Sequence, residues 1–232
     1  MLGVLGGMGP AATATFLAKL ADVTPASRDQ EHLPAIVYSD PATPDRSDAI
    51  LAGGASPLPA MVRGIEFLER AGCDVIAIPC NTAHHWYAEL AAATGVPILH
   101  IVDAVSARID SEARQVSTIG LLATAGTVEA GIYQERLAAG GRSVVDLNDL
   151  GEANPVMAGI RAVKAGELEE ARALLTKAAG MLVDRGAQGL VYGCTDVSAV
   201  LGTTISTVGV GVPVWDSSEA LAAACVAASS GS

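Results

Sequence analysis

Two stretches of the sequence, AGCDVIAIPCNT at residues 71–82 and RGAQGLVYGCTD at residues 185–196, resemble each other. In each, a helical pattern ends at a glycine, an apolar run of strand length follows, and the run stops at a cysteine followed closely by threonine. A second pair, LGVLGGMGP at residues 2–10 and IGLLATAGT at residues 119–127, passes from an apolar run into a loop of small residues. This internal repeat predicts a chain built from two similar halves.

The whole chain alternates short apolar runs with longer helical patterns, which predicts an α/β fold with mainly parallel sheets flanked by helices. Sheets of this kind bind ligands at the carboxyl ends of their strands. Strands are predicted near residues 2–5, 35–39, 75–78, 97–102, 118–122, 144–147, 189–192 and 212–215, and helices near residues 11–22, 58–72, 103–113, 128–141, 167–186 and 217–228.

The repeat also predicts the domain boundaries. The segment GVPVWDSSEA at residues 211–220 has no counterpart before residue 1, so we expect it to cross back and complete the first half. The first α/β domain is therefore predicted to contain residues 1–103 and 208–232, and the second residues 104–207. Two pseudo-symmetric domains that face each other would present their repeated cysteines to one cleft, where we expect the active site.

Composition excludes several classes of partner. The chain of 232 residues is 50% hydrophobic and 17% charged, which is typical of globular proteins. Its net charge is −11 and it has no cluster of Lys or Arg, so we expect neither nucleic acid nor a membrane surface as a partner. With no cationic leader and no apolar run of about 18 residues, the protein is expected to be cytoplasmic.

Cys80 and Cys194 have the placement of reactive thiols. Each is predicted at the carboxyl end of a strand with a helix starting just beyond it, where backbone N–H groups and a helix dipole favour thiolate. A thiol pair across a cleft suits a reaction in which one thiolate removes a proton from carbon while the other thiol returns a proton to the opposite face. Cys73 and Cys225 lack this context and are predicted to be core residues.

Seven motifs, GVLGGMGPAAT, RDQEH, PDRS, IPCNTAH, GLLATAGT, VKAGEL and GCTDVS, occur in order along nearly the whole chain. Together they resemble the aspartate/glutamate racemase family, the cofactor-independent two-cysteine enzymes. The resemblance implies two pseudo-symmetric α/β domains with the active site between them, no cofactor and a homodimer. It also implies an acidic amino acid, aspartate or glutamate, as substrate and Cys80 and Cys194 as the acid/base pair for 1,1-proton transfer.

The resemblance further assigns a substrate shell. Arg46 in PDRS and Lys164 in VKAG match positions that hold substrate carboxylates, a role that suits a dicarboxylate entering a chain of net charge −11. Without the resemblance, Arg46 is typical of a solvated loop charge and Lys164 of an exposed helix end. The remaining matches would serve through hydroxyl, side-chain amide or backbone N–H groups. They are Gly7, Met8, Gly9, Asn81, Thr82, Thr124, Thr127 and Thr195.

The sequence departs from the family pattern in two places. The second cysteine motif is GCTD rather than GCTE, so Asp196 carries a carboxylate one methylene shorter. Ile160 and Arg161 replace a tyrosine of aspartate racemases. Both departures leave open which acidic amino acid is preferred. Asp196 either caps the following helix or acts through its charge, which disfavours thiolate at Cys194 and leaves Cys80 ionised.

Other functions are compatible with single features of the sequence. A zinc site would use Cys80 with His84, but no second Cys or His pair completes a tetrahedral set, so we expect no metal. A pyridoxal cofactor would need a Schiff-base lysine in a phosphate-binding context, and none of the lysines has one. A related isomerase of the maleate isomerase or hydantoin racemase type, a non-catalytic carboxylate-binding protein and a redox protein with a Cys80–Cys194 disulfide also remain open.

The loop at Gly7 loosely matches a dinucleotide-binding fingerprint, Gly7-x-Gly9-x-x-Ala12 after a predicted strand. No acidic residue closes a second strand at the spacing that this fingerprint requires, since the first candidate is Asp40. We therefore expect the backbone N–H groups of the loop to meet a carboxylate rather than a nucleotide. Pro10 is predicted at the first position of the helix that follows.

Overall fold

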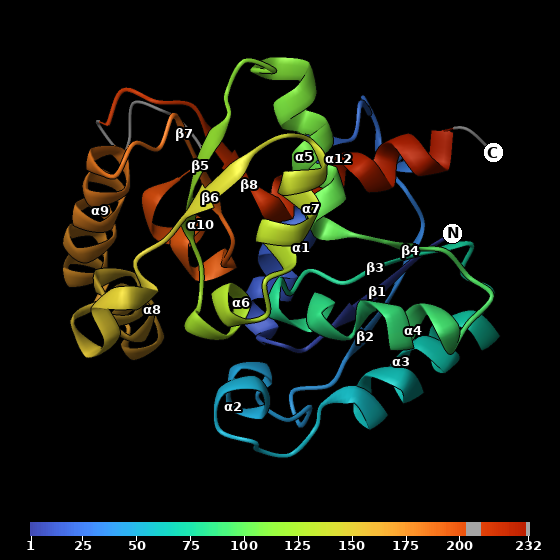
Figure 1. The fold of residues 1–232 in the computed structure, drawn as a ribbon. Coiled ribbons are helices and arrows are strands. Elements are labelled where there is room, and N and C mark those ends of the chain that lie inside the picture. The colour runs from blue at the N-terminus through green and yellow to red at the C-terminus, as the bar shows by residue number, and fades with distance from the viewer. Residues whose placement is uncertain (203–209, 231–232) are drawn as a thin grey trace. The chain divides into compact units, whose positions relative to one another are not determined.

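The computed structural model of the chain describes residues 1–202 and 210–230 (Figure 1). The chain divides into two compact units, one formed by Met1–Ala104 with the C-terminal helix from Ser218 onward, and one formed by Val105–Ser217. Each unit contains one four-stranded parallel sheet flanked by helices. The predicted α/β class is therefore confirmed.

The first unit has strand order β2-β1-β3-β4, with every neighbouring pair parallel. Its strands are β1 (Leu2–Gly6), β2 (Ala35–Ser39), β3 (Val75–Ala77) and β4 (Ile98–Leu99). Its helices are α1 (Pro10–Val23), α2 (Arg46–Leu51), α3 (Leu58–Arg70), α4 (Tyr87–Ala92) and α12 (Ser217–Ser230), with the 3-10 segments η1 (Asp29–Glu31) and η2 (Thr82–Trp86). Helix α5 (Ile101–Glu112) continues the chain into the second unit.

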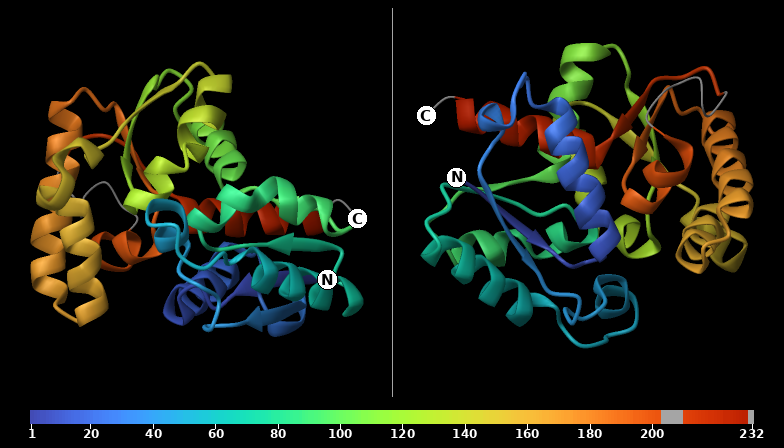
Figure 2. Two further views of the ribbon diagram at one scale, coloured as in Figure 1. Left: turned by 60° about the horizontal axis from the view of Figure 1, so that its bottom comes forward. Right: turned by 180° about the vertical axis from the view of Figure 1, so that it is seen from behind.

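The second unit has strand order β6-β5-β7-β8, again with every neighbouring pair parallel. Its strands are β5 (Thr118–Leu122), β6 (Ser143–Val145), β7 (Gly189–Tyr192) and β8 (Val214–Asp216). Its helices are α6 (Ala125–Glu129), α7 (Ile132–Ala139), α8 (Pro155–Ala165), α9 (Leu168–Asp184) and α10 (Thr195–Leu201), with the 3-10 segment η3 (Asn148–Ala153). Figure 2 shows α8 and α9 side by side in this unit, where they pack against each other.

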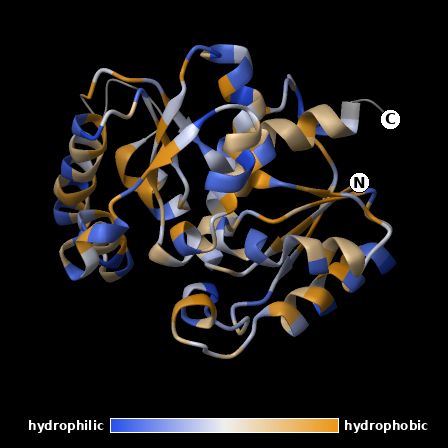
Figure 3. Cartoon of the chain, viewed as in Figure 1, coloured by the Kyte–Doolittle hydropathy of each residue, from blue (hydrophilic) through white to orange (hydrophobic). Residues whose placement is uncertain are grey.

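The two strand orders confirm the internal repeat. β1 occupies the same position in its sheet as β5, and β3 the same position as β7. The paired motifs of the sequence therefore lie on equivalent strands, and the two repeated cysteines follow equivalent strand ends. The central strands are apolar in Figure 3, as expected for parallel sheets covered on both faces. All five residues of β1 and all four of β7 are buried.

The C-terminal segment corrects one prediction. β8 pairs in parallel with β7, so Val214–Asp216 completes the second sheet and not the first. Only α12, from Ser218 onward, belongs to the first unit. The internal repeat explains this pairing: each unit has four strands, and β8 takes the place in the second sheet that β4 takes in the first. The predicted boundary between residues 207 and 208 lies outside the described residues.

One predicted helix and one predicted strand also differ from the structure. The predicted helix 128–141 is broken at Gly131, whose φ of 68° is left-handed, so α6 ends at Glu129 and α7 begins at Ile132. The predicted strand 97–102 is only Ile98–Leu99, because α5 begins at Ile101. No helix in the described part of the chain is long and apolar enough to cross a membrane.

Candidate active site

The strand orders place the candidate site residues at one edge of each sheet. In an open parallel sheet of this order, ligands bind outside the carboxyl ends of the two central strands, where the strand order reverses. In the first unit β1 leads into Gly7, Met8 and Gly9, and β3 leads to Cys80. In the second unit β5 leads into the Thr124 loop and β7 leads to Cys194. Within each unit, the predicted loop and the predicted thiol are therefore neighbours.

The loop after β1 is a tight turn fixed by its glycine. Gly7 has φ of 88°, and a Cβ atom there would lie 2.3 Å from the backbone nitrogen of Asp40. The Gly7 N–H donates to Thr13 Oγ1 at 3.0 Å. This N–H is therefore already bonded within the protein, in contrast to the expectation that the N–H groups of the loop meet a carboxylate. Helix α1 begins at Pro10, which confirms the prediction for that residue, and Met8 is buried.

Cys80 is half-buried and follows β3 through a turn. Its N–H donates to the carbonyl oxygen of Ile78 at 2.8 Å, the i to i+2 bond of a γ-turn centred on Pro79. Asn81 and Thr82 come next and are both buried. The segment that follows is the 3-10 helix η2, and the α-helix begins only at Tyr87. A helix therefore follows the thiol as predicted, and its first part is the 3-10 segment η2.

Arg46 is a half-buried cation at the first position of α2. Its Nη1 donates to the carbonyl oxygens of Thr43 at 3.2 Å and Pro44 at 2.9 Å. Its Nε is buried without a hydrogen-bond partner, and it forms no ion pair with any described residue. Helix α2 packs against η2, the segment that follows Cys80. The first unit thus places a cation without an ion-pair partner among the described residues on a helix that contacts the segment after its thiol.

Two threonines shape the loop after β5. Thr124 is the N-cap of α6, and its Oγ1 accepts from the Thr127 N–H at 3.2 Å. The hydroxyls of Thr124 and Thr127 lie 3.0 Å apart, and Thr127 is fully buried. The Ala125 N–H donates to Met157 Sδ at 3.2 Å, which ties α8 to this loop. Hydroxyl groups are therefore fixed at the carboxyl end of β5, next to the strand that carries Cys194.

Cys194 is half-buried and is the N-cap residue of α10. Its Sγ lies 3.9 Å from Asp196 Oδ2. Burial raises the pKa of the Asp196 carboxyl, while the positive charge of Lys164 and the contact with Cys194 act in the opposite direction. Cys194 is the N-cap residue and Asp196 lies in the first turn of α10, so Asp196 does not occupy the N-cap position. Thr195 is buried beside it.

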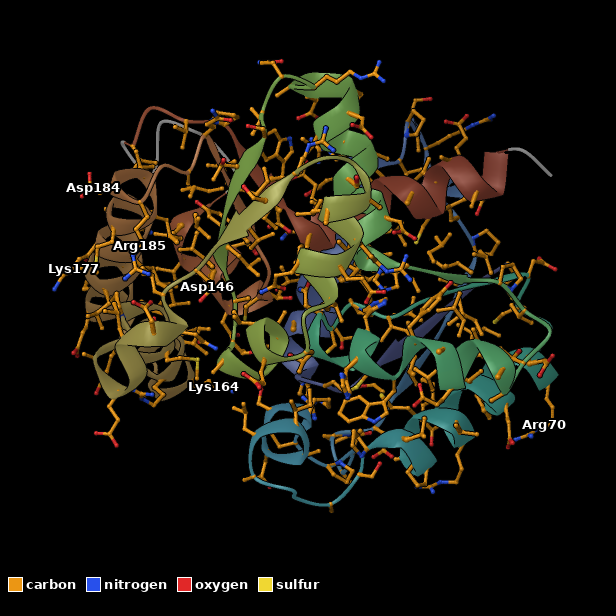
Figure 4. The ribbon with its side chains drawn as sticks, viewed as in Figure 1. Arg70, Asp146, Lys164, Lys177, Asp184 and Arg185 are labelled. Atoms are coloured by element: carbon orange, nitrogen blue, oxygen red, sulfur yellow. The ribbon has the colours of Figure 1, made fainter. Side chains whose placement is uncertain are left out.

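Lys164 is exposed in the last turn of α8, as Figure 4 shows with its label. It forms no ion pair with any described residue, yet its charge acts on Asp196. Of the two residues that replace the family tyrosine, Ile160 is buried in the core and Arg161 is exposed. Arg185 serves the same unit structurally, since it bonds the backbone oxygen of Asp146 (Figure 4).

Two buried residues near the thiols were not among the predicted site residues. His84 lies in η2 and contacts the turn before Cys80 through Ile78. Tyr133 of α7 lies under Gly193, since a Cβ atom on that glycine would lie 3.4 Å from Tyr133 Cε2. Burial raises the pKa of Tyr133 well above its usual value, a hydrogen bond with Ser217 opposes this, and the charges of nearby groups add to it. The i to i+4 spacing of Cys80 and His84 was the available signal for His84.

The other cysteines are buried, which confirms the prediction of core residues. Burial raises the pKa of Cys73, and it raises the pKa of Cys225 to about 12. Thiols with raised pKa values hold little thiolate at neutral pH and are poor bases. Within residues 1–202 and 210–230, no group of three or more His, Cys, Asp and Glu residues is arranged to hold a metal ion.

Comparisons with known proteins identify relatives over the whole chain. The model of the family described as Asp/Glu/Hydantoin racemase matches residues 5–225. The chain is 32% identical to the broad specificity amino-acid racemase RacX of Bacillus subtilis, over 97% of this chain and 96% of that protein. These relatives are amino-acid racemases, and the match extends over both units.

Solved structures give the same result for the fold. Picrophilus torridus aspartate racemase is 32% identical with a TM-score of 0.85, covering 99% of this chain and 94% of that one. The glutamate racemase of Francisella tularensis, solved in complex with D-glutamate, is 17% identical with a TM-score of 0.70. That alignment covers 98% of this chain and 80% of the other, and at this identity it shows a shared fold only.

Proposed function

Because the chain belongs to the Asp/Glu/hydantoin racemase family, we propose that it racemises an acidic amino acid, aspartate or glutamate or both, without a cofactor. In this proposal Cys80 and Cys194 are two bases that act on opposite faces of one α-carbon. The observation that carries the proposal is the equivalence of the two thiols. Each is half-buried and follows the third strand of its unit in chain order, next to a switch-point loop.

The proposed proton transfer balances without a further reactant. The thiolate of one cysteine takes the α-proton and becomes a thiol, while electron density moves into the substrate α-carboxylate. The thiol of the other cysteine then gives its proton to the opposite face of the α-carbon and becomes the thiolate. A free thiol has a pKa of about 8.5, and each unit by which the protein lowers this pKa corresponds to about 1.4 kcal/mol in favour of the thiolate. The reverse reaction follows the same path with the two cysteines exchanged.

We assign the binding of the charged groups of the substrate to cationic and polar residues of the two units. Arg46 is proposed to bind a carboxylate, since a guanidinium without an acidic partner gains a charge-assisted pair from such a ligand. Lys164 is proposed as a weaker electrostatic anchor because it is exposed. Hydroxyl and amide groups would hold the charge that develops during deprotonation. They belong to Asn81, Thr82, Thr124, Thr127 and Thr195, with the Met8–Gly9 backbone beside them.

Asp196 is proposed to make the two thiols unequal. A carboxylate beside a thiol disfavours the thiolate, so Cys194 is expected to hold its proton at rest. Cys80 would then be the resting thiolate. The resemblance to the racemase family implies a homodimer, and we propose that state for this protein, together with the cytoplasmic location expected from the sequence. Light scattering of the purified chain, which gives its mass in solution directly, tests the dimer.

One experiment tests the proposal. The purified protein is incubated in D₂O with L-aspartate, L-glutamate and L-alanine in separate reactions, and the α-proton signal is followed together with the enantiomeric composition. We expect loss of the α-proton and appearance of the D-enantiomer for at least one of the two acidic substrates. A carboxylate-binding protein without turnover would leave both signals unchanged, and that result contradicts the proposal.

Parallel controls separate the related functions. Incubation with maleate and with a substituted hydantoin, followed by product analysis, identifies an isomerase or racemase of the neighbouring type. Mass spectrometry of the native protein without reductant shows whether a Cys80–Cys194 disulfide forms, as a redox protein would require. We expect both tests to be negative and the amino-acid reaction to be positive.

A further inference from the structure

A buried histidine closes the segment that carries the first thiol. His84 is 2% exposed, and its Nε2 lies 3.1 Å from the carbonyl oxygen of Ile78. The same oxygen accepts the Cys80 N–H at 2.8 Å. Because a carbonyl oxygen only accepts, Nε2 is the protonated nitrogen of the His84 ring. One oxygen atom therefore receives two donors, one from the start and one from the end of residues 80–84.

A third hydrogen bond within the same segment holds its backbone. The His84 N–H donates to the carbonyl oxygen of Asn81 at 3.0 Å, which forms the first turn of η2. Cys80 carries the first donor, and Asn81 and Thr82 lie between it and His84. These three are residues that we propose for catalysis and substrate binding. We define residues 78–84 as the clamp loop. The position of the Cys80 thiol depends on how firmly this loop is held.

The His84 ring is itself fixed by two anchored rings. It stacks on Tyr87 with centroids 6.2 Å apart and an angle of 17°, and it meets His100 edge-on at 4.6 Å and 62°. The Tyr87 hydroxyl donates to the carbonyl oxygen of Ile98, and His100 Nδ1 accepts the Val102 N–H. Tyr87 of α4 is thereby tied to β4, and His100 directly follows β4, the neighbour of β3 in the sheet. The imidazole is therefore held in one orientation, with its N–H directed at the Ile78 oxygen.

We propose that His84 is a positioning residue for Cys80, acting through the Ile78 carbonyl, so that the clamp loop presents the thiol in a fixed orientation. An apolar side chain of similar size would fill the same space but would leave this oxygen with the γ-turn bond alone. The neighbouring His85 shows the contrast, because it is exposed and contacts only Trp86 among the described rings. This inference rests on the proposed function for the role of Cys80, but the clamp itself does not.

Three variants separate the hydrogen bond from simple packing. His84→Met keeps a similar volume without a donor, while His84→Gln can place an amide N–H near the position of Nε2. His85→Met is the matched control on the exposed side of the same segment. Each variant is tested by steady-state kinetics in the α-proton exchange assay, by thermal melting and by hydrogen exchange of the peptide covering residues 78–84.

For His84→Met we expect kcat to fall about 10- to 100-fold with a smaller change in KM, because a misplaced base costs this much. Hydrogen exchange in the clamp loop should become faster. His84→Gln should recover most of the lost kcat, and His85→Met should match the original protein. Full kcat in His84→Met, or an equal loss in His84→Gln, would overturn the positioning role. If the unaltered protein shows no racemisation, the proposed function fails, whereas the exchange data still decide whether His84 holds the clamp loop.

Discussion

The two thiols occupy equivalent places in equivalent sheets, but their surroundings differ. Cys80 lies in a γ-turn after a proline, and the groups that hold its turn are N–H donors, its own and that of the His84 ring. Cys194 caps an α-helix and has a carboxylate, Asp196, 3.9 Å from its sulfur. The repeat therefore reproduces the position of the thiol and not its electrostatic environment. The proposed two-base mechanism needs one thiolate and one thiol, and unequal surroundings of this kind would supply that difference.

A second buried acid extends the contrast. Asp216 ends β8 and is 3% exposed, and its charge adds to burial in raising the pKa values of Tyr133 and Tyr192. Tyr133 in turn lies under the glycine before Cys194. The second unit thus holds two acidic groups, Asp196 beside its thiol and Asp216 near Tyr133, and their charges disfavour further negative charge. The first unit instead places the Arg46 cation on a helix that packs against the segment after Cys80.

The largest expected effect comes from removing each thiol in turn. Cys80→Ser and Cys194→Ser should each lower the racemisation rate about 10²- to 10⁴-fold, the range for loss of a general acid or base. The two variants should differ in D₂O, because each keeps the base that faces only one enantiomer. We expect each to exchange the α-proton of a single enantiomer, and of opposite ones. Cys225→Ala is the control, and racemisation at the original rate in either serine variant contradicts the two-base mechanism.

The two cations should differ in importance by about tenfold. Arg46→Gln should raise KM for aspartate about 10- to 100-fold, since a charge-assisted hydrogen bond contributes about 1.5–3 kcal/mol. Lys164→Gln should raise it only about two- to fivefold, because Lys164 is exposed and solvent screens its charge. KM values for aspartate and alanine measured side by side test this. An Arg46→Gln effect of equal size on both substrates would mean that Arg46 does not bind the side-chain carboxylate.

Much of this comparison could be predicted from the sequence. The repeat identified two parallel α/β units and placed both thiols at strand ends, because buried strands and the glycines that precede them leave a clear local pattern. The assignment of β8 failed, since VPVW has the same pattern in either sheet and only pairing with β7 decides. The break at Gly131 was also missed, because a glycine inside a helical pattern is often tolerated.

The contacts behind the thiols were beyond what the sequence could indicate. His84 bonds a backbone oxygen, which has no residue identity in the sequence. Tyr133 reaches the Cys194 region from α7, about 60 residues earlier in the chain, through contacts that only the fold creates. Asp196 was identified by adjacency, but its burial and its response to Lys164 depend on the packing of α8 and α10. Local patterns thus predict the positions of thiols, whereas their chemistry depends on long-range packing.

The charge of Asp196 should appear in the pH dependence. Removing it in Asp196→Asn favours thiolate at Cys194, so the limb of the pH–rate profile that reports this thiol should move to lower pH by about one unit. Burial raises the pKa of the Asp196 carboxyl, so the carboxyl takes up its proton at a higher pH than an exposed aspartate. The two profiles should therefore converge toward acidic pH and separate toward alkaline pH. Identical profiles in both reaction directions would exclude Asp196 as the source of the asymmetry.

The smallest expected effect concerns the residues before the two cysteines. A Cβ atom on Gly193 would lie 2.9 Å from Leu121 Cδ1 and 3.0 Å from Ala123 Cβ. The leucine end can move but the alanine Cβ is fixed to its strand end, so Gly193→Ala should lower the free energy of unfolding by about 1–3 kcal/mol, the usual cost of overpacking.

Pro79→Ala should lower the free energy of unfolding by less, about 0.4–1 kcal/mol, because it introduces no overpacking. Its main effect is to give the unfolded chain more conformational freedom. The γ-turn at Pro79 can still form, since the Cys80 N–H and the His84 ring both remain to hold the Ile78 oxygen. Urea unfolding of the two variants measures both differences. A larger loss for Pro79→Ala than for Gly193→Ala would show that stability depends more on the residue before the first thiol than on the residue before the second, which reverses the expected contrast between the two halves.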